Sequence, residues 1–452
     1  MPFSNDGGKE MEYFVHGMTQ EVITSLIKVD GLNVSSATSS FTLATEKSDP
    51  LTVGKRAGVE YVLLGNIRRS GSEVRMTTQL LNVARKQYTW SNSYRGDVDD
   101  VFEVQSDISS DIARRLTDKL VLRSGQSLAN QRPTSIAAYD LYLKGNFVAD
   151  SDFSVKGLQQ AIGYYNQALT IEPNYARAYS GIATAYYNLA DDFWEPRKAY
   201  PRVRENAVRA IKLDPGLADA YASLASYEIA YGWNWKSAGE YAERAVALNP
   251  NNSFARIMRG WYYLIRNRND EAVSEARAAV VLDPFSISIG ASALSLMRAA
   301  GRHELAIAEA RRMLQVGLGD SSQVRALMSW DYMLSGRLDS ARSQLDSAVS
   351  RSENCCLRTE ALYLAHTGKK TAARKKLQSW IQRKQSQGAY FRIDWIAEVE
   401  AAIGDSDSMF EHPDKAFLDR SVGVPLILHN AELKLYRSDP RFIALETKVG
   451  IE

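Results

Sequence analysis

A short motif, made of an apolar residue, an acidic or amide residue and then proline, recurs through the middle of this chain. Its prolines stand 42, 35 and 34 residues apart, at Pro173, Pro215, Pro250 and Pro284. Because proline lacks the N–H that a helix needs and clashes with the preceding turn, each copy should end a helix. A nearly constant spacing of such breaks predicts a stacked array of similar helical units.

Small residues recur with a similar period where the second helix of each unit should begin. They are Ala161, Ala238, Ala272, Ala306 and Ala341, with Val203 in the place of alanine in one unit. Small side chains at such positions let two antiparallel helices approach closely. The pattern resembles the tetratricopeptide repeat (TPR). The resemblance implies a mainly α fold, a right-handed TPR-like α-solenoid of about seven or eight hairpins over 136–452, degenerate after residue 284.

The first 122 residues lack this repeat and predict a small α/β domain of order α-β-α-β-β-α. Amphipathic and alternating patterns define its expected elements. These are a helix over 11–29, a strand over 32–41, a helix over 53–57, strands from residue 61 and over 74–80, and a helix over 102–120. A polar stretch containing Pro133 predicts a linker over 123–135 between this domain and the repeats.

Segments 12–21, 31–34 and 58–69 of this domain resemble the family often called TolB amino-terminal-domain-like, and Trp90 and Tyr94 also fit it. In that family the module is typically followed by tetratricopeptide repeats. The pair often sits behind a class III adenylate cyclase domain or the winged-helix DNA-binding domain of CadC-like regulators. The resemblance therefore implies a signalling partner domain of one of these kinds. Neither effector is recognisable in this chain, so neither activity is expected of it.

Members of that family usually carry an apolar strand before the pair that appears here as Pro2 and Phe3. This chain begins at that pair. We therefore expect either a missing strand, which would leave a sheet edge unpaired, or a longer protein of which this sequence is a piece.

The charge balance argues against nucleic acid and anionic membranes as general partners. Lys and Arg total 55 and Asp and Glu total 53, for a net charge of +2, which gives no broad attraction to phosphate-rich surfaces. The opening residues lack the basic start and apolar core of a leader. No apolar run approaches the ~18–20 residues that span a bilayer. We expect a cytoplasmic protein, or a periplasmic one if an upstream membrane segment is missing.

No catalytic signature is present in the sequence. It contains no Walker A loop and no strand-linked G-x-G-x-x-G, and no histidine pairs at helical spacing with another histidine or cysteine. His16 is expected to be a partly exposed residue of the first helix. Cys355 and Cys356 are not expected to form a disulfide, since neighbouring residues rarely satisfy its geometry. We expect no metal, no cofactor and no enzymatic activity, with an unrecognised site in the α/β domain as the alternative.

The first helices of successive hairpins line the concave face of such an array. In the register set by the prolines, inward positions carry aromatic, amide and guanidinium groups that suit peptide recognition. The candidate partner-binding residues are Tyr142, Arg177, Thr184, Tyr187, Asn188 and Trp261. We predict a non-catalytic protein–protein interaction module with a sensory or scaffolding role in bacterial signalling, which binds a peptide or protein in this groove. The alternative is a sensory fragment of an adenylate cyclase or CadC-like regulator.

Overall fold

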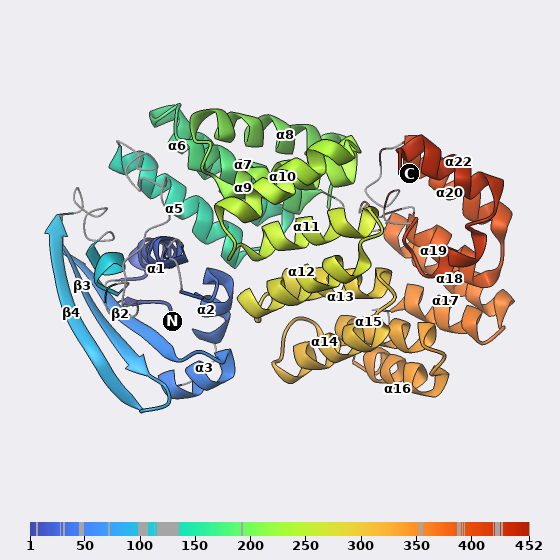
Figure 1. Ribbon diagram of the computed structural model, residues 1–452, viewed down its shortest axis with the longest axis horizontal. Helices are drawn as coiled ribbons and strands as arrows, with labels where there is room; N and C mark the ends of the chain where they lie inside the picture. The colour runs from blue at the N-terminus through green and yellow to red at the C-terminus, as the bar shows by residue number, and fades with distance from the viewer. Residues whose placement is uncertain are drawn as a thin grey trace.

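The computed structural model of the 452-residue chain shows a mainly helical, TPR-like array preceded by a small mixed sheet with helices (Figure 1), as the sequence predicts. The structure describes residues 1–5, 8–27, 29, 32–44, 49–70, 73–97, 107–112, 114, 135–190, 193–351, 356–386, 390, 392, 394–418, 420, 425 and 428–451. The end of the predicted α/β domain and all of the predicted linker except Ser135 lie outside these residues.

A mixed sheet forms the base of the N-terminal domain. Among the described residues it has the strand order β1-β2-β3-β4, with β1 (Ser4–Asn5), β2 (Tyr61–Ser70), β3 (Glu73–Asn82) and β4 (Gln87–Asp97). Strand β1 runs parallel to β2, with Ser4 opposite Asn66, and the other neighbours are antiparallel. Residues 4–5 therefore pair with two residues of β2, Asn66 and Ile67, at this edge of the sheet.

The predicted strand over 32–41 is wrong, because residues from Ala37 onward form helix α2 (Ala37–Ala44). The hydroxyl of Ser36 accepts the backbone N–H of Ser39 at 3.0 Å, in the manner of an N-cap. Short polar side chains that bond the nearby backbone in this way favour a helix start over a strand.

The order of elements in the domain consequently differs from the predicted α-β-α-β-β-α. After β1 and η1 (Lys9–Met11), three helices precede the three long strands, namely α1 (Glu12–Ile27), α2 and α3 (Pro50–Ala57). The predicted closing helix falls largely outside the described residues, although 107–112 are helical.

Helix α1 lies between the sheet and the first repeat helix, α5 (Ile136–Ser151) (Figure 1). Its buried Met18 belongs to one hydrophobic cluster with Ile67 of β2 and Leu143 of α5. At Gly17 the two helices are so close that a Cβ atom would lie 2.5 Å from Leu143 Cδ2, so no larger residue fits without movement. The α/β domain and the first hairpin thus share a core.

The array consists of antiparallel helix pairs. In the described residues these are α5 with α6 (Val155–Ile171), α7 (Ala176–Leu189) with α8 (Pro196–Leu213), α9 (Ala218–Tyr227) with α10 (Trp235–Leu248), α11 (Ser253–Ile265) with α12 (Asn269–Leu282), α13 (Ile287–Ala299) with α14 (His303–Gln315), α15 (Ser321–Leu334) with α16 (Leu338–Val349), α17 (Leu357–His366) with α18 (Lys370–Ser386), and α19 (Asp394–Ile403) with α20 (Ser406–Leu418). A π-helical turn, η4 (Glu228–Gly232), extends α9, and η5 (Glu432–Tyr436) and α22 (Pro440–Val449) follow the last pair.

The sequence markers explain this stacking. The small residues are fully buried where paired helices cross, at Ala161, Val203, Ala238, Ala272, Ala306 and Ala341. Each motif proline comes two residues after a second helix ends, after α6, α8, α10 and α12. Beyond Pro284, glycines with positive φ make the turns inside the pairs, at Gly301, Gly336, Gly368 and Gly404. Because residues with a Cβ avoid that region, these glycines maintain the turn geometry in the degenerate units.

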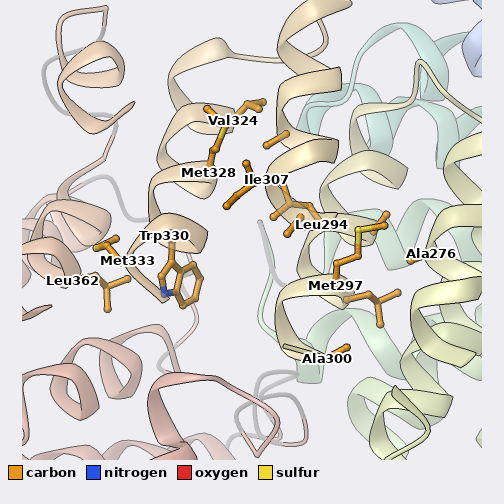
Figure 2. Close-up of a cluster of buried hydrophobic side chains, with 14 of the residues drawn as sticks. Ala276, Leu294, Met297, Ala300, Ile307, Val324, Met328, Trp330, Met333 and Leu362 are labelled. Carbon is orange, nitrogen blue, oxygen red and sulfur yellow. The ribbon is translucent and has the colours of Figure 1, made fainter. Parts of the chain in front are cut away.

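A continuous core joins the units that lack the proline motif (Figure 2). Leu294 of α13 and Ile307 of α14 belong to the same buried cluster as Trp330 and Met333 of α15 and Leu362 of α17. The helices therefore keep stacking after the sequence motif has decayed.

The C-terminal helices fold back onto the third pair. The indole N–H of Trp235, at the start of α10, donates to the backbone carbonyl of Val449 in α22 at 3.0 Å. Phe442 of α22 is fully buried in a cluster with Ile229 of η4 and Met409 of α20. This return brings the last part of the array across the concave face.

Helix α2 of the N-terminal domain contacts the concave side at the fourth pair. The hydroxyls of Ser36 and Ser39 both donate to the carboxylate of Asp283, directly after α12. Ser39 Oγ in turn accepts the N–H of Phe285 at 3.0 Å, and Leu43 packs in the same cluster as Phe285. The concave face is therefore bounded by the α/β domain as well as by the C-terminal helices.

One expectation about the cysteines is also corrected. Cys356 is buried directly before α17, and it is disulfide-bonded rather than a free thiol. Cys355 lies outside the described residues.

Candidate binding channel

Two adjoining cavities of about 470 Å³ each lie on the inner face of the array. The N-terminal cavity is lined by residues of α1, α2, α5, α6, α7, α9, α10, α11 and α13, and the C-terminal cavity by residues of α7, α8, α9, η4, α11, α13, α15, α17 and α19. Most array residues in both linings come from the first helices of their pairs. Tyr187, Asn188, Ser288 and Ser292 line both cavities, so the two meet at these residues and form one channel.

Two of the six predicted partner-binding residues, Tyr187 and Asn188, lie at the junction of the two cavities, and two more, Thr184 and Trp261, line one cavity each. Tyr187 of α7 packs against Phe254 of α11, with ring centroids 5.0 Å apart. Asn188 lies beside Tyr187, Thr184 lines the N-terminal cavity one turn earlier, and Trp261 of α11 lines the C-terminal cavity. All four predicted side chains are half-buried. The structure thus brings aromatic, hydroxyl and amide groups together on one stretch of the channel wall.

The other two predicted residues, Tyr142 and Arg177, are engaged by the α/β domain. The guanidinium of Arg177 donates to both carboxylate oxygens of Glu21 in α1, at 2.9 and 2.8 Å. Its Cζ lies 5.3 Å from the ring centroid of Tyr142, which is buried. Both residues line the N-terminal cavity, but they also hold α1 in place. Sequence patterns did not reveal this role, because Glu21 lies 156 residues from Arg177 in the chain.

His16 of α1 is partly exposed, as the sequence suggested, with 11% of its side chain accessible. Its ring stacks on Phe41 with centroids 3.8 Å apart and meets Phe147 edge-on at 5.4 Å. Burial lowers the pKa of His16 to about 4, so the ring is neutral at pH 7. Asp150 lies 3.6 Å from the ring and accepts a hydrogen bond from Gln20 at 2.6 Å. These contacts attach α1 and α2 to the first hairpin.

A stack of alternating guanidinium and indole groups lines the C-terminal cavity. Arg298 of α13 lies 4.4 Å from the ring centroid of Trp330. Arg358 of α17 lies 5.1 Å from Trp330 on one side and 4.7 Å from Trp395 on the other. Arg392 lies 5.3 Å from Trp395 and completes the stack. We call these five residues the arginine–tryptophan stack; every contact in it is close enough for a cation–π interaction.

Each arginine of the stack also bonds a carboxylate. The pairs are Arg298 with Asp331 at 2.7 Å, Arg358 with Glu398 at 2.5 Å and Arg392 with Asp394 at 2.7 Å. Glu398 accepts a further bond from Asn430 at 2.8 Å. Burial raises the pKa of Glu398 to about 7, with Asp394 adding to the effect. At neutral pH this carboxyl is therefore only partly ionised, while the guanidinium groups keep their charge.

Sequence reasoning did not find the arginine–tryptophan stack. Its residues lie in the degenerate units, where the proline register no longer identifies the inward positions. A signal was nevertheless present: Arg298 and Asp331 each interrupt an otherwise apolar helical segment. Ionisable residues in such segments are buried only when they are paired, so they mark a polar site inside the core.

No group of three or more His, Cys, Asp or Glu side chains in the described part of the chain could hold a metal ion. No described helix is both long and apolar enough to cross a membrane.

The repeat period, the stacked hairpins and the sheet before them define the chain as a TPR-like helical protein with a small N-terminal α/β region. No protein-family model matches the chain. Over 248 residues it is 28% identical to "Putative adenylate cyclase 3" of Rhizobium meliloti (strain 1021), covering 54% of this chain and 41% of that protein. Over 210 residues it is 25% identical to the transcriptional regulator HilA of Salmonella typhimurium (strain LT2), covering 38% of this chain and 37% of HilA. The chain thus spans about two fifths of the length of each relative.

Solved structures also resemble parts of the chain. A thermophilic TPR protein of Thermus thermophilus aligns with a TM-score of 0.34 and 19% identity, over 42% of this chain and 98% of its own. The hetero-tetramer of Cut9 and Hcn1 from the APC/C contains a chain that aligns with a TM-score of 0.42 and 13% identity, over 69% of this chain and 63% of that one.

Proposed function

We propose that this chain is a non-catalytic interaction module that binds an extended protein or peptide segment in its channel. The observation that carries the proposal is the channel itself, in which Tyr187 and Asn188 line both cavities and Trp261 lines the C-terminal one. Aromatic side chains bury large contact areas at little entropic cost, and an amide side chain can both donate hydrogen bonds to a peptide backbone and accept them from it. The size of each cavity is within the range of about 300–1,000 Å³ that is typical of ligand sites.

The role in signalling rests on the two curated relatives. Similar regions occur in a protein named as an adenylate cyclase and in one named as a transcriptional regulator. These are different effectors, so the shared region suits a sensory or scaffolding part that can be joined to either. The TolB-like resemblance of the α/β domain agrees with this role. In this proposal the bound segment is sensed by the channel, and the α/β domain passes the signal to a partner.

A second candidate function is that the chain is the sensory part of a longer cyclase or CadC-like regulator. The relatives favour it, because in each of them the matched region makes up less than half of the protein. Reading the gene upstream of the codon for Met1 distinguishes the two proposals. An in-frame cyclase or winged-helix domain would support the second candidate, and its absence would support a separate module.

The channel is tested with peptides selected by display against the intact chain. The full chain is needed because the α/β domain shares its core with α5. Tyr187→Ala, Asn188→Ala and Trp261→Ala should each weaken the selected peptides by about tenfold or more in fluorescence anisotropy. Tyr88→Ala, an aromatic truncation on the exposed part of β4, is the matched control and should leave affinity unchanged. Equal affinity in all four variants would place the binding site elsewhere.

A further inference from the structure

The central guanidinium of the arginine–tryptophan stack has unused hydrogen-bonding capacity. Among the described residues, Arg358 donates a single hydrogen bond, through Nη1 to Glu398. A guanidinium carries five N–H donors in a rigid planar fork. The guanidinium of Arg358 lies over the rings of Trp330 and Trp395, at 5.1 and 4.7 Å from their centroids, and its other N–H groups donate to no described residue. Because Arg358 lines the C-terminal cavity, these donors are available to a group inside it.

Charge in this cavity favours an anion. Three guanidinium groups lie along the stack, and two of the three carboxylates beside them are almost completely buried, at Asp331 and Asp394. Burial lowers the pKa of Arg358; the carboxylate of Glu398 opposes this effect, whereas repulsion from Arg298 and Arg392 adds to it. A bound anion would reduce this repulsion in a site where water screens charge poorly.

The wall supplied by α13 adds hydroxyl groups. Ser288, Ser292 and Ser295 follow one another at helical spacings of four and three residues and all line the C-terminal cavity. Ser292 and Ser295 are half-buried and make no hydrogen bond within the described part of the chain. Hydroxyl groups can donate to an oxyanion and accept from a ligand hydroxyl or amide. The same cavity is lined by Trp261, which offers a flat apolar surface.

We propose that the C-terminal cavity binds a small organic anion, with its carboxylate or phosphate group on the fork of Arg358 and its flat apolar part against the indole rings. Arginine suits this role because its fork matches two oxygens of a carboxylate or phosphate at once. The cavity volume of about 470 Å³ accommodates a molecule of metabolite size. This inference goes beyond the peptide-binding proposal, because it concerns another ligand and, apart from Trp261, another set of residues.

Calorimetric titration of the intact chain at low ionic strength tests the proposal. The phosphate probes are adenosine monophosphate and inorganic phosphate, and the carboxylate probes are indole-3-acetate and citrate. Adenosine and indole-3-acetamide are the neutral counterparts. We expect at least one anion to bind with a stoichiometry of one, and about tenfold or more tightly than its neutral counterpart. The phosphate and carboxylate arms show which oxyanion is preferred. If no anion binds more tightly than its neutral counterpart, the proposal is overturned.

Matched pairs of substitutions locate the site. Arg358→Gln combined with Glu398→Gln removes both charges of the buried pair and leaves no lone carboxylate, and should weaken the anion at least about tenfold. Arg342→Gln combined with Asp346→Asn removes an exposed ion pair on α16 and should leave binding unchanged. If the first variant does not fold, Arg358→Lys, which keeps the charge and loses the fork, should also weaken binding. Unchanged affinity for the anion in the folded Arg358 variant would overturn this proposal. Peptide binding at Tyr187 is measured separately, so that failure of one proposal can be told from failure of the other.

Discussion

Removing the guanidinium of Arg177 should loosen the α/β domain from the repeat array. In Arg177→Ala the carboxylate of Glu21 would remain with 10% of its side chain exposed and without its partner. Breaking a buried ion pair on one side costs about 3–5 kcal/mol, because the remaining charge stays desolvated. The lost contact with the ring of Tyr142, at 5.3 Å, contributes about 0.5–1 kcal/mol of this. Since the pair is not completely buried, we expect a cost of about 3 kcal/mol.

Two measurements detect this loss of stability. The free energy of unfolding is obtained from urea denaturation, and native-state hydrogen exchange reports the protection of the α1 amides. We expect exchange in α1 to become faster while exchange in the late helix pairs is unchanged. Adding Glu21→Gln to Arg177→Ala should recover part of the loss, because the uncompensated charge is then gone. The control is Arg374→Ala, which breaks an exposed pair with Asp405 and should cost at most about 1 kcal/mol.

The reasoning would be refuted by a cost for Arg177→Ala no larger than that of the control. It would also be refuted if Glu21→Gln gave no recovery, or if exchange in α1 did not change. Any of these results would mean that the shared hydrophobic core alone holds the α/β domain in place.

Four further substitutions test other parts of the structure. Gly17→Ala should destabilise the chain by about 1–3 kcal/mol, because the new Cβ meets Leu143. Its control is Gly163→Ala in α6, where the new Cβ meets nothing within 4 Å, so the change should be neutral or stabilising by about 0.5–1 kcal/mol. Urea denaturation measures both. Phe442→Ala should cost about 3–5 kcal/mol and should raise proteolytic cleavage near α22, since it empties a fully buried site. Burial raises the pKa of Glu398 from its ordinary 4.5 to about 7, so its contribution to stability is complete below about pH 4.5 and is lost as the pH rises through 7. Glu398→Gln should therefore flatten the fall in Tm between about pH 4.5 and 7. An unchanged slope of Tm against pH would contradict the assignment.

The repeat register could be read directly from the sequence. Each proline ends a helix for a reason contained in its own residue, and each small residue such as Ala272 marks a helix crossing within its own unit. These determinants act over a few turns of helix or between neighbouring helices. For the same reason the inward positions were found in the regular units, which brought Thr184, Tyr187, Asn188 and Trp261 to the channel wall.

Local patterns failed where a distant contact decided the outcome. The segment predicted as a strand over 32–41 has apolar residues that suit a strand, but it also carries Ser36 and Ser39, which bond Asp283 about 245 residues further along the chain. A helix places both hydroxyls on one side, toward that carboxylate. Sequence alone offered no reason to prefer this partner.

By itself, the sequence determined that the chain would stack as TPR-like hairpins after an α/β domain, because helix breaks and helix crossings are encoded within one or two units. Only the tertiary structure decided that the groove is bounded by both ends of the chain and that its C-terminal part carries the arginine–tryptophan stack. Arg177 meets Glu21 across 156 residues, and Trp235 meets Val449 across 214. Small rotations between successive hairpins add up along the array, and their sum sets which distant residues meet.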